Sequence, residues 1–143
     1  MTSFVVDASV AAKWCLPAAQ ESLTSQAEQL LYAHSRGEFR FVVPDVFWAE
    51  LGNVVWKAVR SGRTLRTQAI SALALIRNLN IPTSAAGDLL QLAMEIAFAH
   101  HSTVYDSLYV ALAVQSGSVM ITADEKLANA LAAHLPVKWL GSL

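Results

Sequence analysis

Short apolar runs alternate with longer helical stretches along the whole 143-residue chain, and this alternation constrains the fold more than any other feature. The runs are continuous and often β-branched, which is typical of strands that are covered on both faces. We expect strands at Phe4–Val6, Phe39–Val43, Val119–Thr122 and Val137–Leu140, with a weaker fifth at Ile81.

The stretches between these runs have the length and pattern of helices. Glycines at 37, 62 and 117 follow three of them, where a left-handed cap costs glycine nothing. Strands that alternate with helices favour an α/β domain with a mainly parallel sheet and helices on both faces. The expected helices are Ser9–Trp14, Ser22–His34, Val46–Ser61, Leu65–Leu79, Ala85–His100, Asp106–Ser116 and Glu125–Leu135.

Composition excludes several classes of protein. Apolar residues make up 55% of the chain and charged residues 15%, so there is ample apolar surface to offset chain entropy and disorder is excluded. No apolar stretch approaches the roughly 20 residues of a membrane span, and we see no signal peptide. Cys15 is the only cysteine, so no internal disulfide can form and we expect a reducing cytoplasm.

Four acids stand where a parallel sheet would bring them together. Asp7 ends the first apolar run and Asp124 follows the Val119–Thr122 run, so both should emerge at the carboxyl edge of the sheet. Asp106 opens an almost wholly apolar helix, and Glu50 lies one turn into the helix after the second strand. A carboxylate at the start of a buried helix must be paired, hydrogen-bonded or bound to metal.

Each acid also has an ordinary structural interpretation. Asp106 and Asp124 could be helix N-caps, and Asp7 could simply begin a turn. Glu50 shares a helical stripe with Asn53, Lys57 and Arg60, which could be a solvated face. The convergence of the four acids on one edge of the sheet favours a functional site, because four independent caps would have no reason to cluster there.

Clustered carboxylates suit a divalent cation. Two unit charges about 5 Å apart repel by roughly 3 kcal/mol at an effective dielectric near 20, so four acids need protons or a metal. Carboxylate oxygens are hard ligands for Mg²⁺ or Mn²⁺, and such a site suits phosphoryl transfer. The adjacent His100 and His101 point about 100° apart on a helix, so they make a poor chelating pair.

Four segments, each carrying one of the acids, resemble the PIN-domain ribonucleases and in particular the VapC toxins of bacterial toxin–antitoxin pairs. They are Val5–Ser9, Pro44–Leu51, Tyr105–Ala113 and Ile121–Leu127. The resemblance runs along most of the chain, and the third segment is the most specific. It implies one PIN domain over residues 1–143, a three-layer α/β/α sandwich with a central, mainly parallel sheet of four to five strands.

The resemblance also implies a Mg²⁺-dependent endoribonuclease, with Mn²⁺ able to substitute. In such an enzyme Asp7, Glu50, Asp106 and Asp124 would hold the metal and orient the attacking water. Ser9 and Thr122 would hydrogen-bond a ligand carboxylate. A helix cap for Ser9 and strand pairing for Thr122 fit their spacing equally well. The implied partners are RNA and an inhibitory VapB-type antitoxin.

Basic residues provide candidates for holding the RNA backbone. They are Lys13, Lys57, Arg60 and Arg63, whereas Arg66 fits a solvated charge run slightly better. The helix Val46–Val59 is apolar on more than one face, which suggests that another chain covers it. A homodimer and an antitoxin are both candidates.

Two other functions remain open at this level. One is a non-catalytic PIN-like module that binds a protein partner and holds no metal. The other is a phosphatase or phosphoryl-accepting domain, which is weakened because Ser9 stands where a dehalogenase-type phosphatase would carry a second Asp.

Overall fold

A central sheet of five parallel strands organises the chain, which the computed structural model describes over residues 1–143. The strands lie in the order β3-β2-β1-β4-β5. Their bounds are Ser3–Val6 for β1, Arg40–Pro44 for β2, Thr83–Ser84 for β3, Val119–Thr122 for β4 and Val137–Trp139 for β5. The predicted fold class, an α/β/α sandwich with a parallel sheet, is confirmed.

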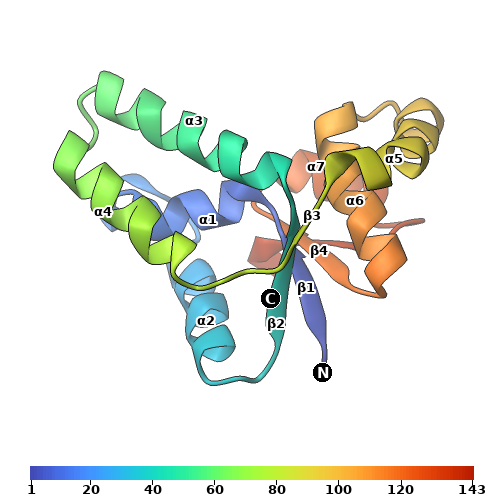
Figure 1. The fold of residues 1–143 in the computed structure, drawn as a ribbon, viewed down its shortest axis with the longest axis horizontal. Coiled ribbons are helices and arrows are strands. Elements are labelled where there is room, and N and C mark those ends of the chain that lie inside the picture. Colours follow the sequence, from blue (N-terminus) through green and yellow to red (C-terminus); the bar gives the residue numbers. More distant parts are fainter.

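Seven α-helices surround the sheet (Figure 1). Helix α1 packs against α2, α3, α4 and β4, whereas α6 packs against α5 and against β1, β2 and β4. Helix α7 lies against β4 and β5. The bounds are Ala8–Cys15 for α1, Thr24–Ser35 for α2, Val46–Arg60 for α3, Arg66–Arg77 for α4, Ala86–His100 for α5, Val104–Ser116 for α6 and Glu125–Leu131 for α7.

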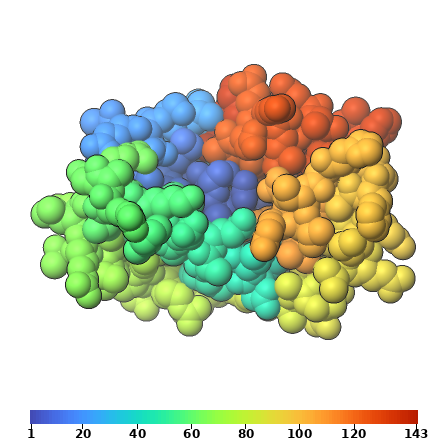
Figure 2. Space-filling view, turned by 90° about the horizontal axis from the view of Figure 1, so that it is seen from above, coloured from blue at the N-terminus to red at the C-terminus, as the bar shows by residue number.

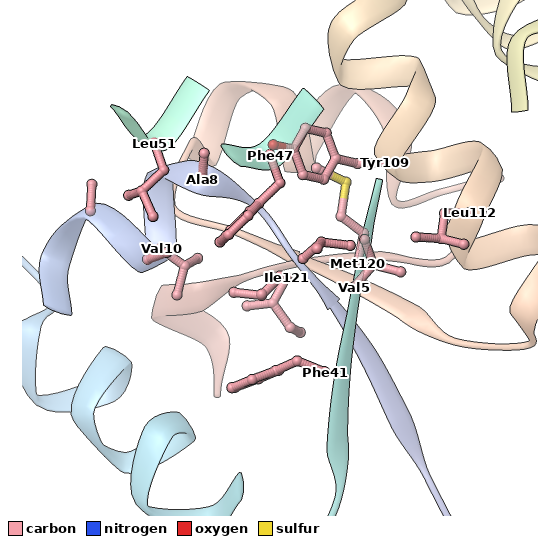
Figure 3. Packing of buried hydrophobic residues seen from close by; sticks show 14 of the residues in the cluster. Val5, Ala8, Val10, Phe41, Phe47, Leu51, Tyr109, Leu112, Met120 and Ile121 are labelled. Carbon is pink, nitrogen blue, oxygen red and sulfur yellow. The ribbon is translucent and has the colours of Figure 1, made fainter. Parts of the chain in front are cut away.

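The core lies between the sheet and the helices that cover it. Val5, Phe41 and Ile121, from three adjacent strands, are fully buried. Figure 3 shows Phe47 of α3 and Tyr109 of α6 packed close to these strands. Residues 107–113 of α6 are all buried, as the apolar pattern of this helix predicts.

Two local expectations were wrong. The fifth strand is Thr83–Ser84 rather than Ile81, because the backbone beyond Pro82 pairs with Val43 and Pro44 of β2. The last helix ends at Leu131 instead of Leu135. Asp45 directly precedes α3 but makes no cap bond there, and its carboxylate instead accepts a hydrogen bond from the Ala86 amide at the start of α5.

The order of the strands places a reversal point beside β1. The chain builds outward from β1 to β2 and β3, and it then returns to place β4 on the other side of β1. In open parallel sheets, ligands bind beyond the carboxyl ends of the strands at such a reversal. The site is therefore expected beyond the ends of β1 and β4. No helix combines the length and the apolar character needed to cross a membrane.

Candidate active site

The four predicted acids come from four segments that meet at the carboxyl edge of the sheet. Asp7 directly follows β1, and Asp124 lies two residues beyond the end of β4. Glu50 is in the first part of α3 and Asp106 in the first turn of α6. Figure 2 looks onto this edge: the chain after β1 (dark blue) is central, with the start of α3 (teal) and α6 (orange) beside it.

Two hydroxyl groups fix the most buried acid. Asp7 is only 7% exposed, and its Oδ2 accepts hydrogen bonds from Ser9 Oγ at 2.7 Å and Thr122 Oγ1 at 2.8 Å. The hydroxyl oxygens in turn accept from the backbone amides of Ala123 and Asp124, both at 3.1 Å. These hydrogen bonds tie the end of β1 to the end of β4 and hold the Asp7 side chain in one orientation.

A tyrosine holds the second acid. The Tyr109 hydroxyl donates a hydrogen bond of 2.6 Å to Glu50 Oε1, joining α6 to α3. Tyr109 has no exposed surface, whereas Glu50 is partly exposed. The hydrogen bond leaves Oε2 as the oxygen of Glu50 with no partner in the protein.

The other two acids lie at helix starts, but only one of them is a cap. Thr103 caps α6, accepting from the Asp106 amide at 3.1 Å, so the Asp106 carboxylate is free of that role. Asp124 does cap α7, since its Oδ1 accepts from the Leu127 amide at 3.1 Å. The cap interpretation is therefore wrong for Asp106 and correct for Asp124, whose Oδ2 makes no hydrogen bond.

Burial and mutual repulsion together raise the pKa values of Asp7, Glu50 and Asp106. Burial, opposed by the Ser9 and Thr122 hydroxyls, raises the pKa of Asp7. Burial and the Asp106 charge raise the pKa of Glu50. Burial, followed by the charges of Asp7 and Asp124, raises the pKa of Asp106. The repulsion links Asp7 to Glu50, Glu50 to Asp106, and Asp106 to Asp7 and Asp124, so the four carboxylates form one electrostatic cluster.

None of the four acids forms an ion pair within the chain. None of the three ion pairs in the structure includes any of the four acids. The donor set, carboxylate oxygens with several positions left free, matches the preference of Mg²⁺ and Mn²⁺ and fits a hard divalent ion in its chemistry. No three of these side chains are already arranged to hold one ion, so binding would have to draw them inward.

The predicted basic residues divide into two pairs. Lys13 is buried and contacts Glu21 at 3.4 Å, and Arg63 contacts the same carboxylate at 2.6 Å. Both are thus engaged within the protein. Lys57 and Arg60 are exposed on α3 and form no ion pair, although Arg60 lies 5.3 Å from the centre of the Trp56 ring.

Sequence reasoning missed two residues that shape the site, Tyr109 and Thr103. A signal for Tyr109 existed, because it follows Asp106 by three positions and so shares its helical face. Its partner on α3 could not be found by spacing. A signal for Thr103 also existed, because Thr is a favoured N-cap and Asp106 lies three residues beyond it.

Comparison with known proteins agrees with this arrangement. The PIN domain family profile matches residues 4–131. Ribonuclease VapC3 of Pyrobaculum aerophilum is 33% identical over 129 residues, which cover 87% of this chain and 92% of that protein.

Solved structures share the fold. Mycobacterium tuberculosis VapC20, described as a Sarcin-Ricin loop cleaving toxin, matches with a TM-score of 0.67 at 17% identity, covering 94% of this chain and 96% of that one. VapBC2 from Rickettsia felis, bound to a DNA fragment from its promoter, matches with a TM-score of 0.64 at 11% identity, covering 96% and 98%. At these identities the two matches show the fold alone. The family profile and the sequence relative go further: this chain belongs to the PIN domain family and is a homologue of the VapC ribonucleases.

Proposed function

We propose that this protein is a metal-dependent endoribonuclease and the toxin of a toxin–antitoxin pair. The observation that carries the proposal is the cluster of four acids, none of them in an ion pair, at the strand-order reversal of the sheet. The homology to Ribonuclease VapC3 supports RNA as the substrate.

In this proposal Asp7, Glu50, Asp106 and Asp124 hold a Mg²⁺ ion, which Mn²⁺ can replace. The bound ion would supply Lewis acidity for hydrolysis of a phosphodiester bond. Ser9 and Thr122 keep Asp7 oriented. Glu50 Oε2 and Asp124 Oδ2, which have no partner in the protein, are available to accept a proton from the attacking water. No side-chain nucleophile is needed.

Lys57 and Arg60 are the candidates for the RNA backbone on the α3 side. Both are exposed, and they lie two and three turns along the helix from Glu50. Replacing either one by Ala should weaken RNA binding more at low salt than at high salt, because phosphate contacts release counterions. Lys13 and Arg63 are weaker candidates, because Glu21 already holds both.

An antitoxin of the VapB type is the proposed inhibitor, with the cytoplasm as the shared location. The support is an apolar groove of about 430 Å³ between α3 and α4, lined by Trp56, Ile70 and Leu73 among others. Trp56 and Ile70 are 54% and 62% exposed. Surfaces of this kind mark sites for a partner chain. Ile70→Asp should weaken the complex with the antitoxin and leave RNA cleavage intact.

A homodimer is proposed through a second apolar surface. Phe98 on α5 and Tyr105 on α6 are 75% and 62% exposed. Phe98 lies near the end of α5 and Tyr105 near the start of α6, and these two helices pack against each other. Light scattering should give the mass of a dimer for the parent and of a monomer for Phe98→Glu.

The deciding experiment is cleavage of RNA by the purified protein with Mg²⁺, with Mn²⁺ and with excess EDTA. Cleavage that requires the metal and is lost in Asp106→Asn supports the proposal. Full cleavage in EDTA, or by the variant, would refute it.

A non-catalytic module that binds a protein partner is the second candidate. The observation in its favour is that no three of the acids are arranged to hold an ion without movement. Calorimetric titration with Mn²⁺ separates the two functions, because only the enzyme should release heat that disappears in Asp106→Asn.

A further inference from the structure

A small hollow adjoins two of the acids on the side away from α3. It encloses about 220 Å³, and its wall includes Asp106 of α6, Asp124 and Lys126 at the start of α7, and the connection between α5 and α6. Figure 1 shows α5, α6 and α7 together at one end of the sheet, with α3 running away from them. The hollow therefore borders the acidic cluster on a side where none of the expected basic residues lies.

Lys126 brings a free positive charge to this hollow. Its side chain is exposed, and it forms no ion pair although Asp124 and Glu125 precede it directly. A free ammonium group beside two acids compensates for part of their repulsion toward a polyanion. Lys126 is the only Lys or Arg side chain in the wall of the hollow.

Further donors line the same wall. His101 ends α5 in the left-handed conformation, with φ +57°, and its exposed ring can donate an N–H hydrogen bond. The Thr103 hydroxyl accepts from the Asp106 amide and has no acceptor for its own proton. Lysine, imidazole and hydroxyl donors in one hollow suit an anion that bears several oxygens.

The size of the hollow limits what it can hold. Sites for drug-sized ligands have volumes of roughly 300 to 1,000 Å³, so a space of about 220 Å³ is small for a whole nucleoside. A phosphate group with part of its sugar is a better match.

Building on the proposed function, we propose that this hollow binds a backbone phosphate of the RNA next to the scissile one, with Lys126 as its principal contact and His101 and Thr103 as additional donors. The RNA then crosses the acidic cluster between two basic flanks, Lys57 and Arg60 on α3 and Lys126 on α7. An acidic cluster that had a basic flank on only one side would repel one end of the strand.

The test measures RNA binding apart from cleavage. A labelled single-stranded RNA is titrated in EDTA, where no cleavage is expected, and its anisotropy is followed at several salt concentrations. Lys126→Ala should raise the Kd roughly fivefold and lower the salt slope by about 0.7, the value for one lost phosphate contact on a single strand. His101→Asn, which tolerates the left-handed backbone, should have a smaller effect.

Matched variants separate position from net charge. Lys126→Arg should bind RNA like the parent. Arg40→Ala removes the same charge at the opposite edge of the sheet, where β2 begins, and should leave both the Kd and the slope unchanged. Calorimetry should show that Lys126→Ala does not weaken Mn²⁺ binding, which excludes an effect through Asp124.

The outcomes distinguish the two proposals. If Lys126→Ala keeps the parental Kd and slope while Arg60→Ala changes them, the hollow does not bind RNA and the proposed function stands. A parent protein that neither binds nor cleaves RNA would overturn both.

Discussion

The Tyr109 hydroxyl donates a hydrogen bond of 2.6 Å to Glu50 Oε1 and so joins α6 to α3 across the candidate site. Tyr109 follows Asp106 by three residues, so one face of α6 carries an acid of the cluster and the group that orients a second acid. With Oε1 held, Oε2 is the oxygen that Glu50 can offer to an ion. Tyr109 is therefore a positioning residue for the proposed metal site.

Removing this hydroxyl should weaken metal binding. Tyr109→Phe keeps the buried ring and leaves Glu50 without its donor. Because groups that orient a ligand typically contribute 10- to 100-fold to affinity, we expect the Kd for Mn²⁺ to rise by about that factor, with a comparable loss of RNA cleavage. Calorimetric titration measures the first quantity and a cleavage assay the second.

Tyr105→Phe is the matched control, because it makes the same chemical change at an exposed position of the same helix. It should bind Mn²⁺ like the parent. Parental Mn²⁺ affinity in Tyr109→Phe would show that the hydrogen bond does not position Glu50 for the ion.

Neutralising Asp106 should separate activity from stability. Burial and the charges of Asp7 and Asp124 raise the pKa of Asp106, so ionised Asp106 destabilises the metal-free protein. Asp106→Asn should abolish cleavage yet raise the metal-free melting temperature by roughly 2–4 °C, the shift that corresponds to about 1 kcal/mol in a chain of this size. Asp88→Asn, at an exposed position of α5, should change neither. If Asp106→Asn melts at a lower temperature than the metal-free parent, the charge of Asp106 is not repelled by Asp7 and Asp124.

The metal-free protein should lose stability as the pH rises above the usual carboxyl range. The pKa values of Asp7, Glu50 and Asp106 are all raised, first by burial, so between the ordinary and the raised pKa values the folded chain binds more protons than the unfolded chain. The free energy of unfolding contributed by these groups is therefore fully present below their ordinary pKa values, and it falls as the pH rises through the raised ones.

Urea unfolding in EDTA, between about pH 4 and pH 7, measures this contribution as the difference between the parent and Asp106→Asn. The variant should gain stability relative to the parent as the pH rises. Saturating Mn²⁺ should stabilise the parent at neutral pH by mass action. A difference between the two proteins that is independent of pH in EDTA would rule out the raised pKa of Asp106.

The strand pattern made the position of the acids predictable. The β-branched runs that end at Val6 and Thr122 are parallel neighbours, so the side chains just beyond them must lie at one edge of the sheet. The hydrogen bonds of Ser9 and Thr122 to Asp7 match what the family resemblance implied, whereas the spacing of these residues left a helix cap and strand pairing equally open. The shared edge of Asp7 and Asp124 follows from the direction of a parallel sheet.

Relations between separate helices and loops were not predictable in this way. The approach of Tyr109 to Glu50 depends on how α3 and α6 pack, which no spacing within either helix encodes. The hydrogen bond from Ala86 to Asp45 likewise depends on the meeting of two helix starts. The segment after α1 is a third example, because the path of residues 16–23 decides which basic residues Glu21 can reach.

Glu21 provides a test of that segment. Glu21 contacts Lys13, which is buried, and Arg63, which is partly exposed, and its own side chain is only 16% exposed. Removing one partner of a buried ion pair is expected to cost about 3–5 kcal/mol, because the other charge stays desolvated. Since Glu21 and Arg63 keep some exposure, we expect Glu21→Gln to lower the free energy of unfolding by about 2–3 kcal/mol, measured by urea denaturation.

Glu38→Gln is the control, because it breaks a pair with Arg36 whose side chains are 54% and 62% exposed. Exposed pairs contribute about 0–1 kcal/mol, so this variant should unfold almost like the parent. Equal losses in the two variants would mean that Glu21 does not hold Lys13 and Arg63 in solution. Arg63, which is partly exposed, would then be available to RNA, as the sequence first suggested, and Arg63→Ala should weaken RNA binding as much as Lys57→Ala does.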